Sequence, residues 1–170
     1  MQTGKARTGI VLYSRSGHSR QVAQRLAQAL KAEILPLHIN RYGKGPFGFL
    51  RACFDSLRQI SLLEHGDLPD LSTYDRVILC GPVWTSFPAI PLRDVLRGHE
   101  GLPASITLFL TAGGQGPAQS AFKAAEADLG RSFVAEASLP NTWEGTERAE
   151  RVLARFFRDL DPAQSIAAAL

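Results

Sequence analysis

Residues 8–19 read TGIVLYSRSGHS, and this stretch decides the fold. Residues 8–13 form a short, continuous apolar run, which is typical of a strand buried on both faces. A polar loop with hydroxyls and a glycine follows, and a helix with one apolar stripe is then predicted from about Gly17 to Lys31. We therefore expect a strand, a short loop and a helix in direct succession.

Strands and helices continue to alternate along the chain. Further strands are predicted at residues 33–37, 76–80, 106–110 and 133–137. Further helices are predicted within residues 41–70, from near Pro91, at residues 118–129 and at residues 149–160. Pro36 in the second strand and the alternating pattern of the fifth strand favour edge positions for both. Five strands alternating with five helices predict an α/β fold with a doubly wound parallel sheet.

The segment at residues 41–70 is the least regular part of the chain. It opens with glycines and Pro46, and helical spacing then appears at Phe49, Leu50, Cys53, Phe54 and Leu57. Three roles are open for residues 42–63: a lid over a ligand, a dimer contact, and plain packing of an irregular second helix. The pattern favours plain packing.

The length of 170 residues and the 45% hydrophobic content allow one domain with a buried core. We expect a single domain over residues 1–170, with its core at about 8–160 and a short C-terminal tail. No stretch approaches the roughly 20 apolar residues that span a bilayer, so no membrane insertion is expected. The first apolar run ends at residues 14–16 and reads as a strand, not as a secretory signal, so the expected location is cytoplasmic.

The net charge of +3 is distributed unevenly. Residues 1–32 contain six basic residues and no acid, so the remaining chain carries −3. A basic N-terminal segment is compatible with an anionic ligand or an acidic partner surface. For Arg20, Arg25 and Lys31 the favoured reading is an exposed helix face. No nucleic-acid motif accompanies this charge, so no nucleic-acid partner is expected.

The cysteines and histidines do not predict a metal site. Cys53 and Cys80 lie far apart and outside any C-x-x-C motif, so both are expected to be small buried hydrophobic residues. The four histidines have no metal-like spacing with Cys, Asp or Glu. No acid–base pair is evident either, and no catalytic residue is assigned.

The loop after the first strand has the composition of a phosphate site. In a doubly wound sheet, ligands bind beyond the carboxyl ends of the strands. Serine hydroxyls can donate to phosphate oxygens, the glycine permits a tight turn, and the following helix presents free N–H groups. The alternative is that one serine is a simple helix cap. The predicted phosphate-binding residues are Ser14, Arg15, Ser16, Gly17, His18 and Ser19.

Two further loops lie at the same edge of the predicted sheet. Residues 80–88 offer an aromatic ring, an aliphatic side chain and two prolines, a platform for a flat aromatic ligand, although Trp84 could instead close the top of the core. Residues 111–116 carry three glycines, which allow the backbone to approach a ring edge, although an ordinary flexible loop is the alternative. The predicted ring-binding residues are Pro82, Val83, Trp84, Thr85, Thr111, Ala112, Gly113 and Gly114.

Together these loops resemble the flavodoxin family. Ser14, Ser16, Gly17 and Ser19 match its hydroxyl-x-hydroxyl-Gly-x-hydroxyl phosphate loop. Residues 74–84 resemble its third strand and first ring-binding loop, and residues 111–114 resemble its second. The similarity covers roughly residues 8–160. It implies a strand order of 2-1-3-4-5 and non-covalent flavin mononucleotide (FMN), with the phosphate at residues 14–19, the isoalloxazine flanked by residues 82–85 and its pyrimidine side at residues 111–114.

The resemblance implies a redox protein, either an electron carrier or an enzyme that reduces a small acceptor with NAD(P)H. The electron donor would be a redox partner protein or NAD(P)H, and a homodimer is left open. Carrier flavodoxins are usually acidic, whereas this chain has a pI near 9.1. The third loop also lacks an aromatic residue, which would leave one ring face open and favours an FMN-dependent oxidoreductase. The alternative is a non-catalytic module that binds a flavin or another phosphate ligand.

Overall fold

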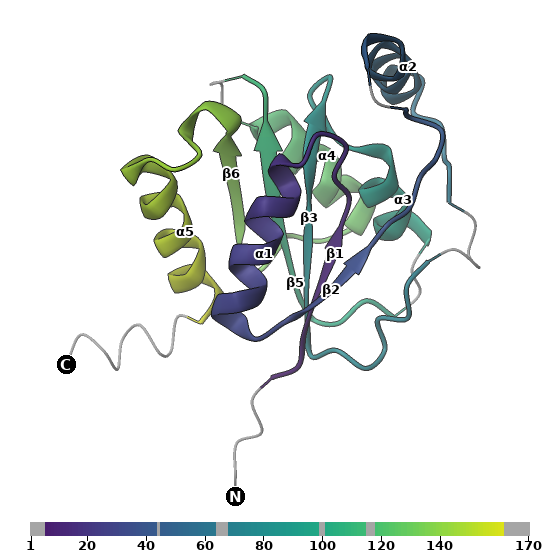
Figure 1. Cartoon of the computed structure of the whole chain (residues 1–170). Coiled ribbons are helices and arrows are strands. Elements are labelled where there is room, and N and C mark those ends of the chain that lie inside the picture. The colour runs from purple at the N-terminus through teal and green to yellow at the C-terminus, as the bar shows by residue number, and fades with distance from the viewer. Residues whose placement is uncertain (1–5, 44, 64–67, 99–100, 115–117, 162–170) are drawn as a thin grey trace, which may run out of the picture.

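The computed structural model describes residues 6–43, 45–63, 68–98, 101–114 and 118–161. Its central sheet has the strand order β2-β1-β3-β5-β6, and all of these neighbours pair in parallel (Figure 1). The five parallel strands are β1 (Thr8–Leu12), β2 (Glu33–Pro36), β3 (Arg76–Trp84), β5 (Ser105–Ala112) and β6 (Glu136–Pro140). Counted without the two-residue strand β4 (Phe87–Pro88), this is the expected order 2-1-3-4-5, which confirms the prediction.

Helices cover both faces of the sheet, as a doubly wound fold requires. They are α1 (His18–Leu30), α2 (Pro46–Leu57), α3 (Ile90–Gly98), α4 (Gln119–Leu129) and α5 (Glu147–Leu160). One face packs against α1 and α5, and the other packs against α3 and α4. Successive strand residues point to opposite faces of the sheet. Ile10 therefore lies in the core beneath α1 and α5, and Val11 lies in the core beneath α3 and α4.

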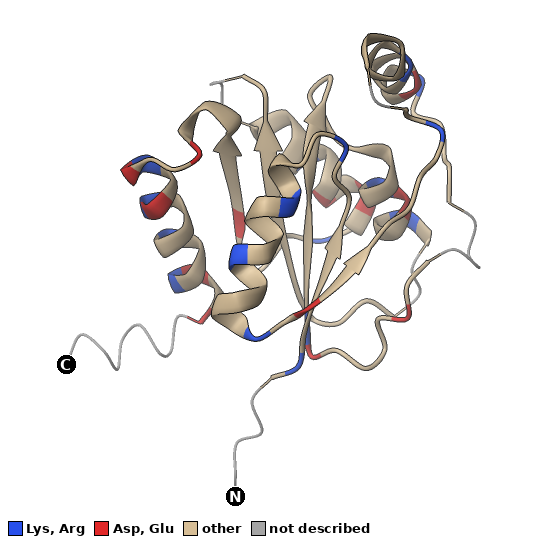
Figure 2. Ribbon diagram, viewed as in Figure 1, with Lys and Arg blue, Asp and Glu red and all other residues tan. Residues whose placement is uncertain are grey.

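The predicted burial of the strands is largely confirmed. All five residues of β1 are buried, in agreement with a strand covered on both faces. The strands β2 and β6 lie at the two edges, as predicted for both. Arg20, Arg25 and Lys31 are exposed, in agreement with a solvated helix face. Figure 2 shows basic positions along α1. Cys80 is buried, whereas Cys53 is only half-buried, and both thiols are free.

Two strand predictions were wrong in their bounds. The strand predicted at residues 76–80 continues to Trp84 and forms a tight hairpin with β4, so part of the predicted loop is strand. The strand predicted at residues 133–137 is β6, three residues later, because β5 pairs from Leu108↔Glu136 to Ala112↔Pro140. Residues before β6 already approach the sheet, since the N–H of Val134 donates to the carbonyl of Ile106 at 2.9 Å.

The irregular segment contains the expected helix, α2, but its large apolar side chains point outward. Figure 1 shows α2 at the periphery, beyond the end of the sheet. Phe49, Leu50, Phe54 and Leu57 are exposed, whereas Ala52 is fully buried in the core, so α2 packs on the protein through a side other than the one its apolar spacing indicates. Within the described ranges, no helix combines the length and apolar character that crossing a bilayer requires.

Candidate functional site

The three predicted loops meet at the carboxyl edge of the sheet. Each follows a neighbouring strand of the order β1-β3-β5. A hydrogen bond of 2.7 Å joins the buried hydroxyls of Ser19 and Thr111, and so links the first loop to the third. Gly81 permits close packing here, since a Cβ would lie 2.6 Å from Cδ1 of Leu92. The fold therefore brings together segments that are 92 residues apart in sequence.

The first loop turns sharply into α1 and leaves backbone donors free. Gly17 has a φ of +103°, a conformation that favours glycine. The hydroxyl oxygen of Ser14 accepts from the N–H of Gly17 at 3.2 Å and from the N–H of Arg20 at 3.3 Å. The N–H groups of His18 and Ser19 have no hydrogen-bond partner among the described residues. The first turn of α1 contains no acid, so this end of the helix can accept an anion.

The two predicted cations of this loop already have protein partners. The guanidinium of Arg15 donates to the carbonyls of Gly43 at 3.3 Å and Gly45 at 2.5 Å, and so ties the loop to the segment before α2. The Nδ1 atom of His18 lies 2.6 Å from a carboxylate oxygen of Glu144. Both side chains lie beside the first loop, and a phosphate contact by either one stays a prediction.

The serines of the loop differ in their availability. Ser16 is exposed at the turn, and Ser14 keeps a hydroxyl hydrogen to donate while its oxygen accepts. Ser19 is buried against Thr111, so these two predicted site residues connect loops and do not line an open surface. A direct ligand contact by Ser19 or Thr111 stays a prediction.

Trp84 closes the end of the core, and its predicted contact with a ring stays a prediction. It is 5% exposed, and its ring meets Tyr13 and Tyr42 edge-on, at centroid distances of 5.4 and 5.1 Å. Of the two roles open to Trp84, closing the core is therefore the one that the structure displays. Its neighbours Pro82 and Val83 are half-buried at the rim.

The turn after Trp84 has an uncommon backbone. Thr85 and Ser86 have φ values of +46° and +69°, as in the hairpin turns that usually use Asn and Gly. The hydroxyl of Ser56 donates to the carbonyl of Trp84 at 3.1 Å and accepts from the hydroxyl of Thr85 at 2.9 Å. This contact from α2 holds the turn, and strained backbone of this kind is often found at functional sites.

A pocket of about 240 Å³ lies where the second and third loops meet. Gly113 and Gly114 are at its rim, and a Cβ added to either glycine would meet no described atom within 4 Å, so a ligand can approach their backbone. No aromatic side chain lines the pocket in the described part of the chain. Its volume is below the roughly 300 Å³ of small ligand sites, so it would hold part of a ligand. Its lining residues are Val83, Ser86, Ala112, Gly113, Gly114, Ala118, Ser120 and Ala121.

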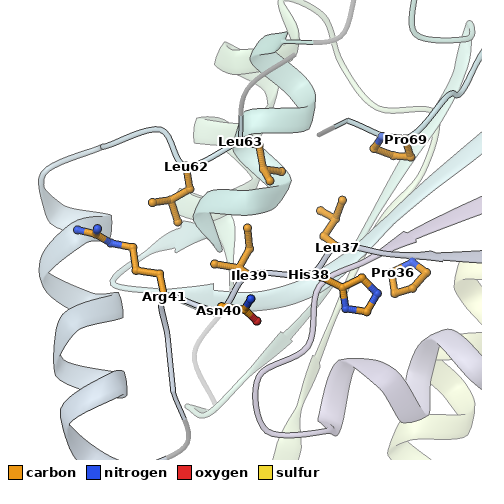
Figure 3. Close-up of a pocket in the computed structure, with 9 residues that line it drawn as sticks. All are labelled: Pro36, Leu37, His38, Ile39, Asn40, Arg41, Leu62, Leu63 and Pro69. Atoms are coloured by element: carbon orange, nitrogen blue, oxygen red, sulfur yellow. The ribbon is translucent and has the colours of Figure 1, made fainter. Parts of the chain in front are cut away.

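A second hollow, which the sequence did not indicate, extends from the first loop along the end of β2. A pocket of about 290 Å³ is lined by Ser14, Arg15 and Arg20 together with residues 36–40. Residues 36–41 also line a larger pocket of about 650 Å³, closed on its other side by Leu62, Leu63 and Pro69. Figure 3 shows His38 and Asn40 on the opposite edge of this pocket from the two leucines. The two pockets share residues 36–40, so they adjoin each other beside the first loop.

Sequence reasoning missed two residues at the end of β6. Glu144 pairs with His18, and Asn141 has a buried side-chain oxygen without a partner among the described residues. Both follow β6 closely, and the residues after a parallel strand are the ones to inspect for a site. Placing the strand three residues too early put that inspection at the wrong position.

Comparison with known proteins supports the architecture. No protein-family model matches the chain, and no curated protein sequence matches it. A flavoprotein from Lactobacillus acidophilus NCFM, solved in complex with FMN, superposes with a TM-score of 0.62 at 18% identity over 78% of this chain and 93% of that chain. An NAD(P)H:quinone oxidoreductase from Methanothermobacter marburgensis gives 0.52 at 16% identity, over 93% and 96% of the two chains. An FMN-dependent NADH-azoreductase from Bacillus anthracis gives 0.54 at 13% identity, over 96% and 99%.

The three superpositions agree with the strand order and the helix placement described above. The expectation drawn from the loops in the sequence is thus confirmed for the architecture. The chain has the flavodoxin-like fold.

Proposed function

We propose that this protein binds FMN non-covalently and uses it to pass electrons from NAD(P)H to a small acceptor. The observation that carries the proposal is the free anion site at the start of α1. The N–H groups of His18 and Ser19 are without a partner among the described residues, beside the exposed Ser16. A phosphate would take hydrogen bonds from these groups and from the Ser14 hydroxyl.

The ring site is assigned to the pocket between Val83 and the glycines of the third loop. The open backbone at Gly113 and Gly114 can donate to the polar edge of a heterocycle, and Val83 gives an apolar contact. When bound, FMN supplies the redox chemistry, and the chain binds its phosphate and orients its ring. The described lining residues would leave one ring face accessible to a second substrate, which supports an oxidoreductase over a simple carrier.

The similar structures support the same assignment of cofactor and donor. One of them is solved with FMN, one is described as FMN-dependent with NADH, and one as an NAD(P)H:quinone oxidoreductase. The basic pI near 9.1 also argues for an enzyme, because carrier flavodoxins are usually acidic.

Cofactor retention is the direct test. The purified protein is incubated with excess FMN and desalted, its visible spectrum is recorded, and the released cofactor is identified by chromatography. The wild type should retain FMN, and Ser16→Asp should lose it by at least about tenfold in affinity, because a carboxylate would repel the phosphate. Ser132→Asp, an equal change at an exposed serine far from these loops in sequence, is the matched control.

A colourless wild type would contradict the FMN proposal, and unchanged retention by Ser16→Asp would contradict the phosphate assignment. Turnover is then measured with NADH or NADPH and a benzoquinone acceptor. A protein that retains FMN but oxidises neither nicotinamide would be a carrier or a non-catalytic binding module.

A further inference from the structure

The helix α2 exposes large apolar side chains and buries polar ones, which is the reverse of an ordinary surface helix. Among the described residues, the large apolar side chains that are exposed number six, and five of them belong to α2. We name these five the α2 apolar face. Its members and their exposed fractions are Phe47 at 86%, Phe49 at 49%, Leu50 at 62%, Phe54 at 57% and Leu57 at 64%.

Four of the five members of the α2 apolar face form a continuous stripe along one side of the helix. Phe47, Leu50, Phe54 and Leu57 recur at spacings of three and four residues, so they form a single stripe. A globular protein normally buries such a stripe, and exposed patches of this kind mark interaction sites.

The polar side of α2 points to the protein and fixes this orientation. The carboxylate of Asp55 is buried and accepts from Nε of Arg41 at 2.7 Å and from the hydroxyl of Tyr42 at 3.1 Å. Ser56 is buried on the turn after Trp84, and Ala52 is fully buried. Rotating the helix to hide its apolar face would break these contacts. The exposure is therefore built into the fold.

The exposed charged residues of α2 and its C-cap, Arg51 and Arg58, are both basic. Residues 41–63 contain four basic residues and one acid. That acid is Asp55, which is buried and paired, so no exposed carboxylate lies on the helix. Arg51 and Arg58 are exposed and each follows a leucine of the stripe, so they lie along one of its edges.

We infer that the α2 apolar face docks on the surface of an anionic lipid bilayer, with the helix lying in the membrane plane. Phenylalanine and leucine side chains flanked by arginines match the chemistry of interfacial helices, in which the apolar face enters the acyl boundary and the cations meet acidic headgroups. The helix is peripheral, so it can reach a flat surface without the body of the protein intervening (Figure 1). Nothing in this inference depends on a bound cofactor.

Charge disfavours a second copy of the chain as the occupant. In a two-fold dimer through this face, the same patch meets itself, so Arg51 and Arg58 of both protomers would gather at one interface to which α2 brings no exposed carboxylate. An anionic surface removes this repulsion, and binding to it should weaken as salt screens the charges.

The test is co-sedimentation with vesicles of phosphatidylcholine alone and of phosphatidylcholine mixed with phosphatidylglycerol. Wild-type protein should bind the mixed vesicles, at least about tenfold more strongly than the neutral ones, and less strongly in high salt. Leu50→Ser with Phe54→Ser should weaken binding by at least about tenfold, because two large apolar groups are lost. Arg51→Gln with Arg58→Gln should weaken it by about tenfold at low salt.

Matched controls distinguish binding through the α2 apolar face from non-specific binding of exposed apolar or basic residues to vesicles. Val134→Ser removes the one large exposed apolar side chain that the described residues have outside α2, and Arg151→Gln with Arg155→Gln removes two exposed cations from α5. Both should leave vesicle binding unchanged. Equal binding by the Leu50 and Phe54 variant, or no binding by the wild type, overturns the inference. A dimer detected by light scattering that this variant dissolves, without vesicle binding, would assign the face to a second copy instead.

Discussion

Asp55 is the residue that ties α2 to the rest of the protein, and its ionisation should control local stability. Two hydrogen bonds, the stronger effect from Arg41 and a weaker one from Tyr42, hold the pKa of Asp55 below its usual value. A carboxyl group with a lowered pKa stabilises the folded state above its unfolded pKa, near 4, and this contribution is lost as the pH falls through the folded pKa.

We predict that Asp55→Asn lowers the free energy of unfolding by about 1 kcal/mol at neutral pH, a small value because solvent screens the exposed part of the ion pair. Urea unfolding should show the gap to wild type closing as the pH is lowered below about 4. Asp159→Asn, which removes an exposed pair with Arg155, should change stability by less than about 0.5 kcal/mol. A gap for Asp55→Asn that is constant with pH would show that the charge of Asp55 does not stabilise the fold.

At the scale of elements, the turn of the β3–β4 hairpin has Thr85 and Ser86 at positive φ, a conformation that these residue types rarely adopt. Ser86 has a φ of +69°, where glycine is favoured and a side chain costs about 1 kcal/mol. We predict that Ser86→Gly raises the free energy of unfolding by about 0.5 kcal/mol, after the entropy of glycine in the unfolded chain is subtracted. Denaturant titration measures this, with Ser132→Gly as the control, since Ser132 has no positive φ. A destabilised Ser86→Gly would mean that its side chain has a role in the turn beyond the backbone.

Across the whole molecule, local patterns located most elements but not the contacts between them. The strand β1 was predictable because an unbroken apolar run has few alternatives to a strand covered on both faces. The register of β6 was not, because the partners of Glu136 and Pro140 lie on β5, about 28 residues earlier. Trp84 and Ser19 are residue types that often contact ligands. Both are buried here, Trp84 against Tyr42 and Ser19 against Thr111, and these partners are distant in sequence. The outward orientation of the α2 apolar face could not be predicted, because it depends on the hydrogen bond from Arg41 to Asp55. Helical spacing alone does not reveal that bond.

The proposed phosphate site makes a prediction for the stability of the whole molecule. A ligand that binds only the folded state adds about 2.7 kcal/mol at 100 times its Kd, which is a rise in Tm of roughly 5 to 10 °C for a chain of this size. FMN should give such a rise, and riboflavin, which has the same ring without the phosphate, should give a much smaller one at equal concentration. In Ser16→Asp the advantage of FMN over riboflavin should disappear, because the groups at the start of α1 act only on the phosphate. Equal rises with both ligands in the wild type would mean that the ring pocket alone provides the affinity, and the role of residues 14–19 would have to be abandoned.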